Sequence, residues 1–90
     1  MTKTKNSDDL AELILSLKSQ EDVQEFIDNM FTQSEWDTLS KRWNIIKMLD
    51  EGRTQRDISK ELQVSLCKVT RGSKILKNKD SVIYKFLKNN

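Results

Sequence analysis

The sequence lacks proline and histidine altogether, and it has only two glycines and one cysteine in 90 residues. Without histidine, a Ser-His triad, a histidine general base and a histidine-bearing metal site are excluded. Cys67 has no second cysteine to pair with, which excludes an internal disulfide and a cysteine-rich zinc site and fits a reducing compartment. The scarcity of proline and glycine disfavours a turn-rich all-β fold. We therefore predict an all-α protein with no metal and no cofactor.

Long hydrophobic runs are missing too, because no stretch approaches the ~20 apolar residues that span a bilayer. The polar opening MTKTKNSDDL does not have the pattern of a signal peptide. With 36% hydrophobic and 33% charged residues, the chain is too apolar for a disordered segment. Its length allows one domain. We predict a cytoplasmic protein with a flexible arm over residues 1–6 and a single helical domain over residues 7–90.

The net charge of +2 conceals an uneven distribution along the chain. Residues 1–52 carry 6 Lys and Arg against 11 Asp and Glu, a balance of −5, whereas residues 53–90 carry 10 against 3, a balance of +7. A basic half on a nearly neutral protein indicates a binding patch for a polyanion. The alternative is a solvated lysine-rich tail.

Apolar residues recur at helical spacing through the first half of the chain. They predict helices over about 8–18, 20–31 and 33–51, with Ser19 as the N-cap of the second helix and Gly52 just after the third. The positions predicted to face inward are Leu10, Leu13, Ile14, Leu17, Val23, Phe26, Ile27, Met30, Trp36, Leu39, Trp43, Ile46 and Leu49. A chain this short, cut into short helices, buries only ~60–65% of its unfolded surface. We therefore expect a symmetric homodimer.

Residues 54–72, TQRDISKELQVSLCKVTRG, have the pattern of a helix-turn-helix, which we place at about 55–77. Thr54 caps a helix over about 55–62, Gln63-Val64-Ser65 forms a tight turn, and Ser65 caps a second helix that begins at Leu66. Ile58, Leu62, Val64 and Val69 are the apolar positions, and Ser59 is small where the two helices cross. Gln63 stands where this motif usually has glycine.

The polar residues of this motif predict DNA contacts. Gln55 and Arg56 begin the first helix, whose positive end favours a phosphate. The first turns of the second helix are predicted to enter a major groove. The full predicted set is Gln55, Arg56, Ser59, Leu66, Cys67, Lys68, Thr70, Lys74 and Lys77. A helical hairpin with scattered lysines is the alternative without DNA.

Two segments of the chain resemble the bacterial tryptophan repressor family. QRDISKELQVSLCKVTRGSKILK is similar to the helix-turn-helix of that family, TRGS (Thr70–Ser73) is its most distinctive tetrapeptide, and Met30–Gly52 is similar to its preceding long helix. The resemblance implies an intertwined homodimer of six helices per chain. It also implies a repressor that binds L-tryptophan as corepressor and then binds palindromic operators of genes of tryptophan metabolism.

The resemblance also implies a tryptophan pocket. Arg42 and Arg71 match the arginines that sandwich the indole, and a guanidinium plane stacks well on that ring. Ile46 would line the apolar wall, and Gly72 would let the backbone approach the ligand. In the family, Arg71 and Gly72 come from one chain and the other pocket residues from its partner. The implied tryptophan-binding set is Asn29, Phe31, Thr32, Arg42, Ile46, Arg71 and Gly72.

Ile75 departs from the family pattern, which has a small polar residue near the ligand amine, and Lys74 replaces the usual asparagine. A related group of regulators shares the long helix and the helix-turn-helix but lacks TRGS. A regulator that binds DNA without tryptophan is therefore the main alternative. A third hypothesis is a helical dimerisation module whose basic end binds an acidic protein. We predict no enzymatic activity, because no nucleophile–base pair and no phosphate-cradling glycine loop is present.

Overall fold

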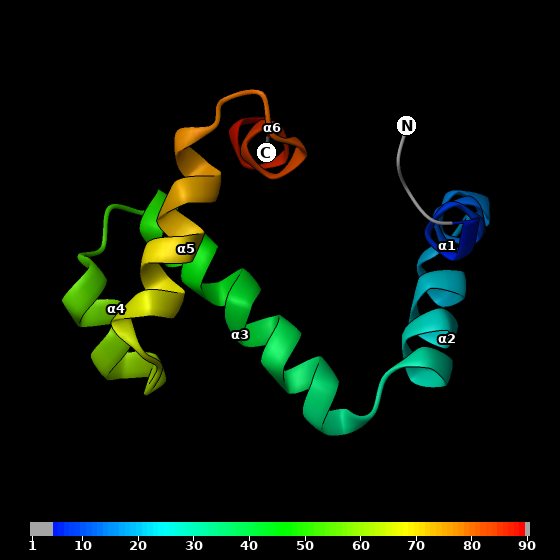
Figure 1. Ribbon diagram of the computed structural model, residues 1–90, viewed down its shortest axis with the longest axis horizontal. Helices are drawn as coiled ribbons and strands as arrows, with labels where there is room; N and C mark the ends of the chain where they lie inside the picture. The colour runs from blue at the N-terminus through cyan, green and yellow to red at the C-terminus, as the bar shows by residue number, and fades with distance from the viewer. Residues whose placement is uncertain (1–4, 90) are drawn as a thin grey trace. The chain divides into compact units, whose positions relative to one another are not determined.

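The computed structural model describes residues 5–89, with side chains from residue 9 onward. Over this range the chain forms helices and no strands (Figure 1). The six helices are α1 (Lys5–Ser16), α2 (Gln20–Met30), α3 (Gln33–Asp50), α4 (Gln55–Leu62), α5 (Leu66–Lys77) and α6 (Val82–Lys88). The prediction of an all-α fold with six helices is confirmed.

The first helix is the element whose predicted bounds differ most. α1 begins at Lys5 and ends at Ser16, so Lys5 and Asn6 are helical rather than part of the predicted arm. Residues 1–4 of that arm lie outside the described residues. α1 stops short of residue 18 because Ser19 adopts an extended backbone, with φ −138° and ψ 165°, to cap α2. The predicted bounds of α2 and α3 are within one residue, and α4 matches residues 55–62.

Hydroxyl side chains begin the helices where the sequence predicts. The Oγ of Ser19 accepts a hydrogen bond from the Asp22 N–H at 3.1 Å, and Thr54 Oγ1 accepts from the Asp57 N–H at 3.1 Å. Ser65 Oγ accepts from the Lys68 N–H at 3.3 Å. Each bond satisfies a backbone donor that has no partner within its helix, which fixes where the helix starts.

Gly52 ends α3 in the left-handed conformation that its position predicts, with φ 93°. Its N–H donates to the Leu49 carbonyl at 3.0 Å, and the Arg53 N–H donates to the Met48 carbonyl at 3.1 Å. These two bonds form a Schellman motif, which only a residue with positive φ completes easily. The chain therefore turns sharply between α3 and α4.

The helices group into two compact units, one with α1 and α2 up to Ser34 and one from Glu35 onward. In the first unit, Phe26 packs edge-on against Phe31 with ring centroids 6.5 Å apart. Large apolar side chains of this unit remain exposed within the single chain: Leu10, Leu13, Ile14, Leu15, Val23 and Met30. Most of these were predicted to face inward, so this unit leaves apolar surface that its own helices do not cover.

The core of the second unit lies where α3, α4 and α5 meet. Ile45, Ile58 and Val69 are at most 2% exposed, and the partly buried Met48, Leu49, Leu62 and Val64 pack against them. The inward positions predicted for the helix-turn-helix are therefore confirmed. On α3 the buried pair is Ile45 and Ile46, whereas Leu39, which was predicted to face inward, is 38% exposed.

α6 contributes a second set of contacts within this unit. Trp43 of α3 packs against Phe86 of α6 with ring centroids 6.0 Å apart, as expected for a tryptophan in a packing role. Lys88 Nζ donates to Asp50 Oδ1 at 2.7 Å. The hydrogen bond to Asp50, together with the charge of Asp50, raises the pKa of Lys88.

The turn between α4 and α5 has an unusual backbone at Gln63. Gln63 has φ 56° and ψ 49°, the left-handed region, which costs an L-residue other than glycine roughly 1–2 kcal/mol. The Ser59 hydroxyl donates to the Val64 carbonyl at 2.5 Å, and the Val64 N–H donates to the Ser59 carbonyl at 3.1 Å. Ser59 has the small side chain that was predicted for the helix crossing. Its hydroxyl forms a hydrogen bond within the turn.

Replacing Ser59 with alanine should lower the free energy of unfolding by about 1 kcal/mol, because the partly buried Val64 carbonyl loses its side-chain donor. Chemical denaturation followed by circular dichroism measures this change. Ser73→Ala is the control, because the Ser73 hydroxyl forms no hydrogen bond with any residue from 9 to 89. Equal stability losses in the two variants would contradict the assignment of the Ser59 hydroxyl.

Candidate nucleic-acid interface and ligand cleft

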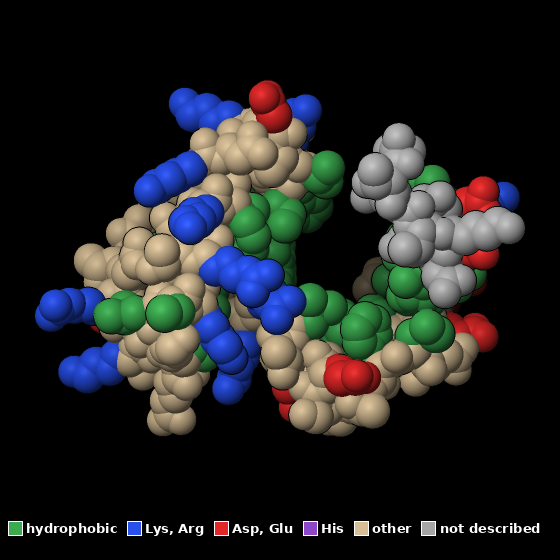
Figure 2. Space-filling view, in the orientation of Figure 1, with side chains coloured by type: hydrophobic (Ala, Val, Ile, Leu, Met, Phe, Trp, Pro, Cys, Tyr) green, Lys and Arg blue, Asp and Glu red, His purple; other side chains and the backbone are tan. Residues whose placement is uncertain are grey.

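α5 presents two different faces outside the core, because ~3.6 residues complete each helical turn. One face carries most of the predicted groove contacts, and all of them are exposed: Leu66, Cys67, Thr70, Lys74 and Lys77. Lys68 and Arg71, which are also exposed, lie on the other face together with Ile75. Figure 2 shows Lys and Arg side chains over the region of α4 and α5. The structure therefore separates Lys68 from the other DNA contacts predicted on α5.

The two helices of the motif are joined by a side-chain hydrogen bond on their exposed side. Thr70 Oγ1 of α5 donates to Gln55 Oε1 of α4 at 3.0 Å. Because the oxygen of Gln55 accepts this bond, its amide nitrogen keeps its two donors. Arg56, the next residue, is exposed on the same first turn. Gln55 and Thr70 are thus brought together, with Arg56 next to Gln55 in the chain, at a helix N-terminus that favours an anion.

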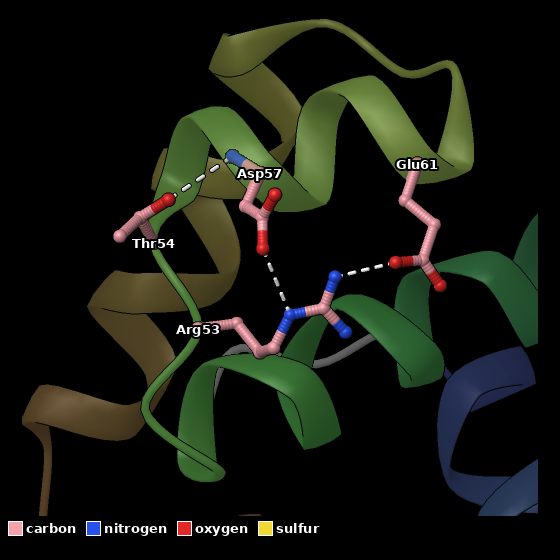
Figure 3. A network of polar contacts seen from close by, with 4 residues as sticks. All are labelled: Arg53, Thr54, Asp57 and Glu61. Carbon is pink, nitrogen blue, oxygen red and sulfur yellow. Dashed lines mark hydrogen bonds and ion pairs between the residues drawn. The ribbon is translucent and has the colours of Figure 1, made fainter.

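The segment before α4 is tied to the outer side of that helix (Figure 3). Arg53 Nε donates to Asp57 Oδ2 at 3.1 Å, and Arg53 Nη2 donates to Glu61 Oε1. The hydrogen bonds to Glu61 and Asp57 raise the pKa of Arg53. Exposed ion pairs contribute little stability. Their effect here is to pair two exposed carboxylates of α4 with the segment that precedes the helix.

A cleft of about 330 Å³ lies on the second face of α5, between α3 and the α4–α5 turn. This volume is within the range of small-molecule sites, roughly 300–1,000 Å³. Four cations line it, and no Asp or Glu does. Its lining residues are Thr38, Lys41, Arg42, Ile45, Gln63, Val64, Ser65, Lys68, Arg71, Gly72 and Ile75.

Two matched stripes of side chains supply most of this lining. Thr38, Lys41, Arg42 and Ile45 are spaced i, i+3, i+4, i+7 on α3, and Lys68, Arg71, Gly72 and Ile75 repeat that spacing on α5. Residues at these intervals share one side of a helix. The lining residues that were not predicted as site residues from the sequence are Thr38, Lys41, Ile45, Gln63, Val64 and Ser65. The repeated spacing was the available signal, but only the helix crossing shows that the two stripes face each other.

The tryptophan-binding set implied by the resemblance is only partly brought together here. Arg42, Arg71 and Gly72 line the same cleft within one chain. Ile46 is 3% exposed in the core and does not line the cleft, where Ile45 takes the predicted apolar position. Asn29, Phe31 and Thr32 belong to the first compact unit.

Gly72 has a packing role that the sequence did not indicate. A Cβ atom at this position would lie 3.0 Å from Ile45 Cγ2 and 3.4 Å from Leu49 Cδ1. Gly72 is also buried, so its missing side chain allows α5 to cross α3 closely. Gly72 therefore lets two helices pack closely, in addition to its implied role of letting the backbone approach a ligand.

The charges of the cleft are not balanced within the chain. Among residues 9–89, no carboxylate forms an ion pair with Lys41, Arg42, Lys68 or Arg71. Four cations around one cleft repel each other, and an anionic ligand relieves that repulsion. The same residues include no cluster of Cys, Asp and Glu suited to a metal ion. None of the described helices is long and apolar enough to cross a membrane.

Comparisons with known proteins identify the family. The family model of the Trp repressor protein matches residues 5–90. The chain is 35% identical over 82 residues to a Trp operon repressor homolog of Chlamydia caviae, covering 90% of this chain and 81% of that protein. It is 36% identical over 78 residues to the homolog of Chlamydia trachomatis serovar D, covering 81% and 83%.

A further relative is described as the uncharacterized protein YerC of Bacillus subtilis, 35% identical over 72 residues, covering 80% of this chain and 69% of that protein. No solved structure matches the chain. The match to the family model spans nearly the whole sequence and includes α4, α5 and the cleft described above. The chain therefore belongs to the Trp repressor family.

Proposed function

We propose that this protein is a homodimeric, sequence-specific DNA-binding repressor in the cytoplasm, activated by L-tryptophan and acting on operators of genes of tryptophan metabolism. The observation that carries the proposal is the division of α5 into an exposed polar face and a cleft-lining face. Membership in a family of repressors supports the DNA-binding role. One helix thus links a DNA-reading surface to a ligand site.

The exposed face of α5 would read the major groove. Leu66, Cys67 and Thr70 lie in its first turns, where a recognition helix meets base edges. Lys74 and Lys77 would contact phosphates, as would Arg56 and the free donors of the Gln55 amide. In this arrangement Ser59 acts through the turn, because its hydroxyl is bonded to Val64. Two such helices in a symmetric dimer would meet successive grooves of a palindrome, about 34 Å apart.

The cleft would couple ligand binding to DNA binding. An indole ring stacked between the guanidinium groups of Arg42 and Arg71 would bridge α3 and α5, and the cations would hold the carboxylate. A bridging ligand fixes the angle of α5 and favours the conformation that binds DNA. A coupling of ~1–3 kcal/mol raises DNA affinity roughly 5- to 150-fold.

Exposed apolar side chains on α1 and α2 support the dimer. Leu10, Leu13 and Ile14 are each more than 40% exposed in the single chain, although they share one side of α1. Large contiguous apolar patches on soluble proteins mark interaction surfaces. A second copy of the chain would cover this surface.

Adding L-tryptophan should tighten binding of the protein to a palindromic operator at least about fivefold and raise its Tm. Gel shifts and thermal melts with and without millimolar L-tryptophan measure both effects. Operator affinity should also fall steeply with salt, because phosphate contacts release counterions. D-Tryptophan is the matched ligand control. Unchanged operator affinity and Tm at millimolar L-tryptophan would refute the corepressor role.

A regulator that binds DNA without tryptophan is the second candidate. Ile75 lines the cleft and is partly buried there, so its branched side chain occupies part of the ligand volume. This candidate predicts the same preference for a palindrome and the same salt dependence, with no change on addition of L-tryptophan. A module that binds an acidic protein instead predicts no palindrome preference.

A further inference from the structure

Gln63 combines a strained backbone with a place in the ligand cleft. It is the one non-glycine residue with positive φ among residues 5–89, and it is at the same time a lining residue of the cleft. Glycine adopts this conformation without a steric penalty, and the helix-turn-helix motif usually has glycine here. A non-glycine residue at a strained backbone position indicates that its side chain has a role of its own.

The hydrogen-bonding groups of the cleft indicate what that role is. Lys41, Arg42, Lys68 and Arg71 are donors only. The Ser65 hydroxyl already accepts from the Lys68 N–H, and Thr38 has a partner of its own. The carboxamide of Gln63 makes no hydrogen bond with residues 9–89, and it contains a neutral acceptor oxygen. A ligand with both an acidic group and an N–H donor therefore finds cations for its acid and Gln63 for its donor.

We propose that Gln63 is a specificity-determining residue of the cleft, whose carboxamide oxygen accepts a hydrogen bond from the ring N–H of the bound aromatic amino acid. The inference rests on the proposed ligand-responsive function. Because Gln63 also forms the turn that leads into α5, a ligand held by it contacts the α4–α5 turn directly. Recognition of the ligand and positioning of α5 therefore share one residue.

The test is Gln63→Gly. This substitution should stabilise the ligand-free protein and at the same time weaken its binding of L-tryptophan. Glycine removes the steric cost of positive φ, so the Tm of the ligand-free protein should rise by a few degrees. The same change removes the acceptor, so the Kd for L-tryptophan should rise roughly three- to tenfold. A purely structural role for Gln63 would give the first effect without the second. Thermal melts and isothermal titration of L-tryptophan into the full-length protein measure them.

Gln63→Asn is the matched variant, because asparagine tolerates the left-handed region and keeps an amide that is one methylene shorter. Its affinity for L-tryptophan should lie between those of the wild type and Gln63→Gly. A ligand without the ring N–H, such as 3-benzothienylalanine, should bind the wild type and Gln63→Gly equally. Loss of discrimination between these two ligands in Gln63→Gly identifies the N–H as the recognised group.

The outcomes separate this inference from the proposed function. If the wild type binds L-tryptophan and Gln63→Gly binds it equally well, the role of Gln63 is wrong and the corepressor role stands. If the wild type binds neither ligand, the corepressor role is wrong and the inference falls with it. If Gln63→Gly loses Tm as well as affinity, the loss of binding reflects damage to the turn, and the inference is overturned.

Discussion

Replacing Gly72 with valine is expected to lower the free energy of unfolding by about 3 kcal/mol. The added Cβ would lie 3.0 Å from Ile45 Cγ2, 3.4 Å from Leu49 Cδ1 and 3.5 Å from Ile46 Cγ1, before its two methyl groups are counted. Two of these neighbours are at most 3% exposed, so they have little room to move away. α5 must therefore separate from α3. For a domain of this size the Tm should fall by roughly 4–8 °C for each kcal/mol.

Lys74→Val is the control for this prediction, because it places the same β-branched side chain on the exposed side of the same helix. Both variants are measured at one protein concentration, since the stability of the proposed dimer would depend on it. Gly72→Ala should cost less than Gly72→Val, because the better helix propensity of alanine, about 1 kcal/mol, offsets part of the overlap. Equal losses in Gly72→Val and Lys74→Val would show that Gly72 does not set the crossing of α5 over α3.

Replacing Arg71 with alanine is expected to abolish the effect of L-tryptophan on operator affinity, a loss of roughly 5- to 150-fold in the liganded state. The guanidinium of Arg71 lines the cleft opposite Arg42, and no carboxylate among residues 9–89 pairs with it. It therefore remains available both to stack on an aromatic ring and to hold a carboxylate. Without it, the ligand loses its main contact on α5 and no longer bridges to α3.

Lys74→Ala distinguishes the two faces of α5 in the same assay. Lys74 lies on the groove-facing side, so its loss should weaken operator binding with and without L-tryptophan and leave the ratio between the two unchanged. In Arg71→Ala, by contrast, operator affinity should be the same with and without L-tryptophan. Gel shifts over a series of L-tryptophan concentrations measure it for each variant. A full tryptophan response in Arg71→Ala would remove Arg71 from the ligand site.

The local features of this protein could be predicted from the sequence because their causes are local. Ser19, Thr54 and Ser65 begin helices through hydrogen bonds that span three residues. Gly52 ends α3 because of its own φ, and the inward positions of the helix-turn-helix follow from helical spacing. The start of α1 was predicted three residues late, at about residue 8 rather than at Lys5.

The site depended on how helices distant in the sequence cross. Spacing predicts that Lys68, Arg71 and Ile75 share one side of α5, but not that this side faces Arg42 rather than DNA. Likewise, Ile45 and Ile46 are equally apolar neighbours, and the crossing decides that Ile45 reaches both core and cleft. Interactions within a helical turn depend on residues close together in the sequence, so the sequence alone predicts the helices. The cleft could not be predicted in this way, because its walls come from side chains that are many residues apart in the sequence and meet only in the folded chain.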